Sequence, residues 1–154
     1  MVDRVSAFIT IGGKLSSQQL PEFLDLIAQE DLSLEWDGKP FEVSQFVPGH
    51  PLCLMSHEVA LGQFTQLEDF CFARGLPFRR WCDGCSSWMP QRAVFDGKGD
   101  VVYIDTDGGD RALLGRNTVT DLETFESIVA WFDAADFTVP ALEIVPHPER
   151  NGHS

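Results

Sequence analysis

The chain contains no long apolar run. In a sequence of 154 residues that is 44% hydrophobic, no segment reaches the length of about 18 uncharged apolar residues that marks a membrane-spanning helix. Its start, Met1-Val2-Asp3-Arg4, lacks the basic and then apolar pattern of a secretory signal. We therefore expect a cytoplasmic protein without a membrane partner, whose size and apolar content suffice for one domain with its own core.

Basic residues are scarce. Lys and Arg number 11 against 24 Asp and Glu, which gives a formal net charge of -13. Proteins that bind duplex nucleic acid directly use clustered Lys and Arg to release the counterions of the phosphates, so no direct nucleic-acid binding is expected. The acidic surface favours a basic protein partner, and the simpler alternative is that the charge keeps the protein soluble and monomeric.

Cysteine occurs four times, without the spacing of a disulfide framework, so reduced thiols are expected. Cys82 and Cys85 are separated by two residues and would supply half of a tetrahedral zinc site. The other half would come from His50, Cys53 or His57, although this spacing matches no zinc family. Zinc is the only cofactor that the sequence suggests, and the alternatives are a redox pair or two inert cysteines in a turn.

Complete catalytic and ligand-binding motifs are missing. The sequence has no Gly-x-Ser-x-Gly nucleophile elbow. Gly12-Gly13-Lys14 lacks the earlier glycine of a phosphate-binding loop and is followed by Leu15 instead of Ser or Thr. Residues 105–110 place acids at alternate positions like the start of a calcium loop, but Arg116 stands where a bidentate Glu is needed. An enzyme is therefore the less favoured class.

A pattern repeated three times is the strongest positive signal. A turn precedes a helix that opens on Leu-x-x-Phe, at residues 20–23, 67–70 and 122–125. The first two copies extend into residues 32–38 and 76–84, where each has a Trp shortly before an Asp-Gly turn. This arrangement is typical of a duplicated β-α-β unit.

Hydrophobic periodicity predicts the order of the elements. The expected strands are residues 5–11, 32–36, 52–55, 76–81, 93–95, 100–104, 112–114 and 137–145. The expected helices begin at Ser16 or Ser17, near Phe64, and at Thr120, where Glu123 would complete a capping box. The buried stripe of the third helix is expected to consist of Leu122, Phe125, Ile128, Val129 and Phe132.

These elements predict an α+β fold. Duplicated β-α-β units would form a largely antiparallel sheet with helices on one face, in a ferredoxin-like manner, extended by a hairpin and a third helix. The short hairpins favour antiparallel strands over the competing α/β fold with helices on both faces. The single domain is expected to span residues 1–145, and residues 146–154 are expected to form a flexible C-terminal tail.

Arginine and tryptophan gather around the second β-α-β unit. Such a group would stack on a base or anchor a partner, unless it forms ordinary salt bridges around core tryptophans. Because neighbours on a strand point to opposite faces, Arg79 and Arg80 cannot both line one pocket. The group consists of Arg74, Arg79, Arg80, Arg92, Trp81 and Trp88.

Three functions from different classes remain open. The first is a non-enzymatic acidic interaction protein that binds a basic, nucleic-acid-handling protein and inhibits or regulates it. This class includes a DNA-mimic-like role, for example in the anti-defence of a mobile element. The second is a small-ligand or zinc-binding enzyme that uses Cys82 and Cys85 with His50 and His57. The third is a structural module that forms a homodimer. The residues expected to bind a partner are Glu22, Asp25, Asp105, Asp107, Asp110, Glu123, Glu126, Arg79, Trp81 and Trp88.

Overall fold

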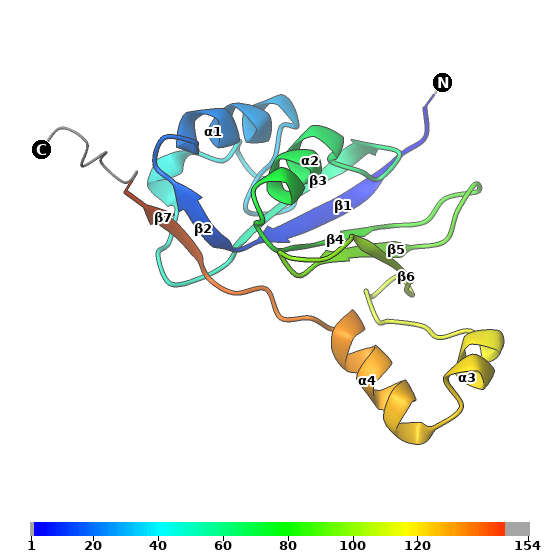
Figure 1. The fold of residues 1–154 in the computed structure, drawn as a ribbon. Helices are drawn as coiled ribbons and strands as arrows, with labels where there is room; N and C mark the ends of the chain where they lie inside the picture. The colour runs from blue at the N-terminus through cyan, green and yellow to red at the C-terminus, as the bar shows by residue number, and fades with distance from the viewer. Residues whose placement is uncertain (1, 147–154) are drawn as a thin grey trace, which may run out of the picture.

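The computed structural model describes residues 2–146 and arranges them as two sheets with four α-helices (Figure 1). The strands are β1 (Arg4–Ile11), β2 (Gly13–Ser16), β3 (Leu52–Ala60), β4 (Phe78–Cys82), β5 (Gln91–Phe95), β6 (Val102–Asp105) and β7 (Leu142–Val145). The helices are α1 (Leu20–Gln29), α2 (Thr65–Ala73), α3 (Arg116–Leu122) and α4 (Phe125–Ala135), and the long connection before β3 holds a 3₁₀ turn, η1 (Val43–Gln45).

The main sheet has five strands in the order β3-β1-β4-β5-β6, and every neighbouring pair is antiparallel. The expected α+β class with a largely antiparallel sheet is therefore confirmed. β1 lies inside the sheet, where Ile9 pairs with Leu54 of β3 on one side and Arg80 of β4 on the other. The expected hairpin also forms, because β5 and β6 pair across residues 96–101.

The two halves of the sequence repeat do not fold equally. The second copy forms the unit β3-α2-β4, whose two strands flank β1. In the first copy the expected strand at residues 32–36 is reduced to bridges of Ser33 with Pro40 and Met55. Asp31 and Asp37 both have positive φ, 54° and 59°, and these left-handed residues bend the chain on either side of Ser33. The complete ferredoxin-like pattern therefore stays a prediction.

The main core lies between one face of this sheet and the pair α1 and α2 (Figure 1). Alternate residues of β1, such as Ala7, Ile9 and Ile11, point into it. Phe23 of α1 meets Phe70 of α2 with their ring centroids 5.7 Å apart. The helices bury Phe23 and Ile27 of α1 and Leu67, Phe70 and Cys71 of α2 in this core. We call this side of the sheet the front face.

The third predicted helix is wrong in two respects. It is broken into α3 and α4 at Glu123, whose φ of 67° ends α3, and the cap of α4 is Thr124, whose side chain accepts a hydrogen bond from the backbone N–H of Ser127. Its stripe is also not buried, since Phe125 is 77% exposed. α4 packs on the sheet near its C-terminal end, where Ala135 and the partly buried Trp131 meet the opposite side of the sheet, the back face.

The last strand is shorter than expected and lies outside the main sheet. Only Leu142–Val145 forms β7, which pairs in parallel with β2. The chain before β7 passes so close to Gly12 that a Cβ atom there would lie 1.9 Å from the carbonyl oxygen of Pro140. This position therefore requires glycine, and it ties the C-terminal segment to the end of β1.

Three smaller expectations have different outcomes. The short strand predicted at residues 112–114 is only a bridge between Thr106 and Ala112. The C-terminal tail was predicted to be flexible, and its residues from 147 onward lie outside the described residues. Within residues 2–146, no helix has both the length and the apolar character that crossing a membrane requires.

Candidate functional site

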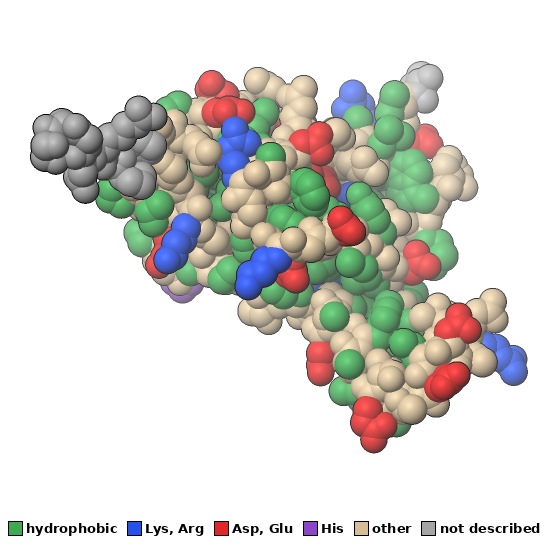
Figure 2. All heavy atoms as spheres, viewed as in Figure 1, with side chains coloured by type: hydrophobic (Ala, Val, Ile, Leu, Met, Phe, Trp, Pro, Cys, Tyr) green, Lys and Arg blue, Asp and Glu red, His purple; other side chains and the backbone are tan. Residues whose placement is uncertain are grey.

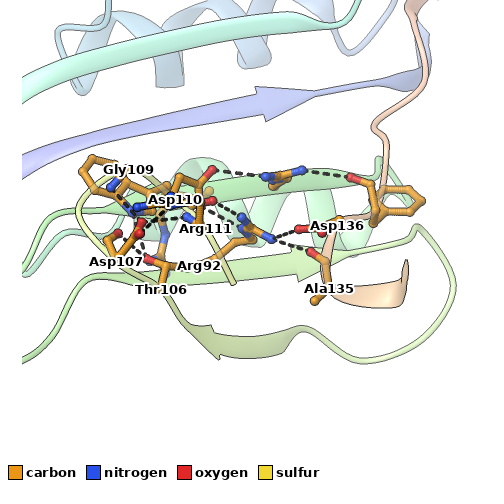
Figure 3. Close-up of polar contacts among 12 residues, drawn as sticks. Arg92, Thr106, Asp107, Gly109, Asp110, Arg111, Ala135 and Asp136 are labelled. Carbon is orange, nitrogen blue, oxygen red and sulfur yellow. Dashed lines mark hydrogen bonds and ion pairs between the residues drawn. The ribbon is translucent and has the colours of Figure 1, made fainter. Parts of the chain in front are cut away.

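A buried arginine organises the back face of the sheet. Arg92 of β5 is fully buried, and strand alternation turns it away from the main core, which takes its neighbour Ala93. Its Nε donates to Oδ1 of Asp110 at 2.8 Å, and its Nη1 donates to Oδ1 of Asp136 at 2.9 Å and to the carbonyl of Ala135 at 2.7 Å (Figure 3). One guanidinium thus fastens both the loop after β6 and the end of α4 to the sheet.

The acidic loop after β6 is held by hydrogen bonds among its own residues and by arginines of the sheet. Asp107 Oδ1 accepts from the backbone N–H groups of Gly109 and Arg111, each at 2.9 Å, and its Oδ2 accepts from the Arg111 side chain at 2.6 Å. These donors lower the pKa of the Asp107 carboxyl. Asp110 accepts from Arg79 at 3.2 Å in addition to Arg92. The resemblance to a calcium loop therefore reflects a self-satisfied turn.

Trp81 also belongs to this internal network. Its ring stacks on Phe8 with centroids 5.6 Å apart. Its indole Nε1 donates to the hydroxyl of the buried Thr106 at 3.0 Å, and that hydroxyl donates to the carbonyl of Asp107. Trp88 lies elsewhere, and its indole donates to the carbonyl of Asp83.

All four arginines of the predicted cluster form ion pairs with acids. Arg74 pairs with Glu22 of α1, and Arg80, on the front face, pairs with Glu68 of α2 at 3.2 Å. Arg79 points to the back face instead, as strand alternation requires. These ion pairs agree with the alternative that the cluster forms salt bridges within the protein.

The predicted partner-binding residues do not form one surface. Arg79, Trp81, Asp107 and Asp110 lie in the back-face network, whose hydrogen bonds already use their polar atoms. The remaining acids of that group are exposed, and they are distributed over α1, the end of β6 and the α3–α4 region. These exposed residues are Glu22, Asp25, Asp105, Glu123 and Glu126.

The residues of the predicted zinc site have separate surroundings. Cys82 ends β4 and is buried, which raises the pKa of its thiol. Cys85 lies 3.9 Å from a carboxylate oxygen of Asp3, and the carbonyl of His50 accepts from the N–H of Leu142. Among the described residues, no group of three or more potential ligands could hold a metal ion.

His57 lies in a Ser–His–Asp chain that sequence reasoning missed. Its Nδ1 is 2.8 Å from Oγ of Ser6, which occupies a bulge of β1, and its Nε2 is 3.4 Å from Oδ2 of Asp37. In serine hydrolases a buried acid orients the imidazole. Here the Asp37 side chain is 84% exposed, so its ion pair contributes little in water. Stacking on Trp36 positions the ring instead, and we assign no reaction to this chain.

A groove of about 350 Å³ separates α4 from the β5–β6 hairpin on the back face. Val94, Val102 and Ile104 line its sheet side, and Trp131 and Phe137 line its helix side. Its far end is rimmed by Asp96 and Asp100 of the turn between the strands. Sequence reasoning missed this groove, because it treated the α4 residues as core, although Val102 and Ile104 on one side of β6 indicate an apolar face there.

Comparison with known proteins adds no family. No protein-family model, no curated protein and no solved structure matches this chain. The function must therefore be argued from the geometry and charge of the chain itself.

Proposed function

We propose that this protein is a non-enzymatic acidic interaction protein that binds a basic, nucleic-acid-handling protein and inhibits or regulates it. The proposal rests on where the charge is left after folding. Within residues 2–146, five arginines are held in ion pairs with five acids. The net charge of -13 is therefore carried by residues outside these pairs, where it remains free to attract a cationic surface.

The α3–α4 region carries this charge next to exposed apolar side chains. Figure 2 shows it as a lobe that projects from the rest of the molecule and bears acidic side chains. Asp121, Glu123, Glu126 and Asp133 lie in this lobe, whereas Arg116 is its only base. Together with the exposed ring of Phe125 between Glu123 and Glu126, they make a surface suited to a partner with basic and apolar residues.

The test is recovery of a partner from nuclease-treated host lysate with the tagged full-length chain, followed by measurement of Kd for the purified partner. We expect one stoichiometric basic protein whose affinity falls about tenfold or more as the salt concentration rises from about 50 to about 500 mM. The variant E123Q/E126Q should bind more weakly and with less salt dependence. The variant E35Q/E58Q is the matched control, since it removes the same charge from exposed positions outside the lobe.

Two outcomes would overturn the proposal. One is recovery of the bait alone under both salt conditions. The other is a partner whose Kd does not change with salt and that binds both double variants like the wild type.

A further inference from the structure

The outer edge of the main sheet is open next to the apolar groove. β6 is the last strand in the order β3-β1-β4-β5-β6. The C-terminal end of β6 is covered, because the N–H of Leu113 donates to the carbonyl of Asp105 at 2.8 Å. Residues 102–104, in contrast, have no further strand beside them within residues 2–146. Val102 and Tyr103 are 55% and 57% exposed, and β6 contains neither the Lys nor the Pro that commonly protects an edge strand.

The two sides of this edge differ in chemistry. On the back face, Val102 and Ile104 lead into the apolar groove under α4. On the front face, Tyr103 borders a second hollow of about 280 Å³, which is also lined by Glu68, Asp69 and Asp100. Arg80 neutralises Glu68, so the two aspartates are left to attract a cation.

A fixed negative charge also stands at the rim of the groove. Asp96 Oδ1 accepts from the backbone N–H groups of Lys98 and Gly99 at 2.9 and 3.0 Å. These hydrogen bonds, that of Gly99 first, lower the pKa of the Asp96 carboxyl below its ordinary value. A segment that follows β6 therefore meets an apolar surface on one side and acids at its end and on the other side.

We propose that an extended segment of the partner, in which large apolar residues alternate with Lys or Arg, adds as a sixth strand beside β6. Successive side chains of a strand point to opposite faces. The apolar side chains then enter the groove under α4, while the basic ones reach Asp69 on the front face and Asp100, which borders both hollows. Main-chain hydrogen bonds to a sheet edge supply affinity, and the alternating pockets supply selectivity. This inference rests on the proposed function and names the recognition site for the basic partner.

The test uses three synthetic ten-residue peptides and the full-length protein. The first peptide alternates Lys with Val or Phe, the second has the same composition with its basic and apolar residues in separate blocks, and the third is the alternating peptide with N-methyl groups on every second backbone nitrogen. Calorimetry gives Kd, and the amide spectrum shows which strands respond. We expect the alternating peptide to bind at least about tenfold more tightly than the other two and to shift the amide signals of β6.

Variants of the protein test the apolar and the acidic contacts of the edge separately. V102E places a charge in the apolar groove and should weaken the alternating peptide about tenfold or more. D69N/D100N should weaken it about fivefold to tenfold and reduce its salt dependence. E35Q/E58Q is the control with the same loss of charge at exposed positions outside the edge and the lobe, and it should leave the Kd unchanged. Both altered sites are on the surface, so the unchanged far-ultraviolet spectrum of each variant serves as the check on folding.

Three results would overturn the inference. The first is that the N-methylated or the block peptide binds as tightly as the alternating peptide. The second is that V102E binds the alternating peptide like the wild type. The third is that V102E converts a dimer into a monomer, which would assign the edge to a second copy of this chain. If the basic partner binds with salt dependence but ignores V102E and D69N/D100N, the proposed function stands and only this site is wrong. If the alternating peptide binds as expected but no basic partner exists, the edge of β6 is a binding site and the proposed function is wrong.

Discussion

The two faces of the main sheet are stabilised in different ways. On the front face, α1 and α2 close over a continuous apolar core in which Arg80 is the one buried arginine, paired with Glu68. On the back face the buried apolar residues are few, with Val94, Ile104 and Ala135 in one small cluster and Trp81 outside it, and the buried Arg92 holds the α4 end through its hydrogen bonds. Hydrophobic burial is non-directional, whereas a buried arginine requires its specific partners.

This difference explains why the exposed groove lies on the back face. The front helices bury apolar residues in the core over more than one turn each, Phe23 and Ile27 of α1 and Leu67 and Phe70 of α2. α4 packs on the sheet near its C-terminal end, through Ala135 and the partly buried Trp131, and the groove lies between this helix and the β5–β6 hairpin. A polar anchor at a single point can thus hold a lobe while its apolar face stays available for a partner.

The largest effect is expected from a cavity in the front core. Phe78 of β4 is fully buried, and its ring lies 5.7 Å from that of Phe95. F78A should lower the free energy of unfolding by about 3–5 kcal/mol, measured by urea denaturation. F125A is the matched control, because this exposed ring should change the value by less than about 0.5 kcal/mol. Equal losses in the two variants would contradict the distinction between a packed front face and an open lobe.

A loss of similar size, but confined to the back face, is expected for R92A. The change leaves Asp110 and the carbonyl of Ala135 without their buried donor, and breaking a buried ion pair costs about 3–5 kcal/mol. Hydrogen exchange should show lost protection in α4 with retained protection in β1. R111A removes an ion pair whose arginine is exposed and should cost no more than about 1 kcal/mol. Uniform loss of protection in R92A would mean that the two faces unfold as one unit.

The smallest effect is expected when the protein is acidified. The pKa of Asp107 in the folded protein lies below its ordinary value of 3.8, owing to the backbone and side-chain donors of Arg111. Its contribution to stability is therefore fully present above that value and is lost as the pH falls through the folded pKa. Between about pH 5 and about pH 2 the amide signals of residues 105–111 should shift before those of β1. D107N should remove this early transition, and an unchanged transition in D107N would assign it to another carboxyl.

Local patterns predicted the elements that the front face uses. The spacing of Phe23 and Ile27 and the glycine after α2 were sufficient for α1 and α2, because the same apolar residues that define each helix also bury it. The same reasoning failed for residues 120–132. Leu-x-x-Phe recurs there, but Glu123 adopts a left-handed conformation and Thr124 begins a new helix. A periodic apolar pattern does not reveal whether a surface is present to cover it.

The composition of the candidate site was visible only in part. The acid excess and the alternation of β6 are sequence properties, and they remain the basis of the proposed partner. The arginines were recognised as a cluster, but their division between two faces depends on β4 and β5 lying side by side. The groove depends on a contact between Arg92 and Ala135, 43 positions apart, which no local pattern encodes.

The sequence by itself determined the α+β class, the two front helices, the β5–β6 hairpin and the net charge of -13. These properties follow from residue type and short-range periodicity, which act within a few positions of the chain. Only the tertiary structure decided which charges are neutralised, which apolar residues stay exposed and where the open edge lies. Those outcomes depend on the partners that distant segments supply, because a charge or an apolar side chain is satisfied only by what packs against it.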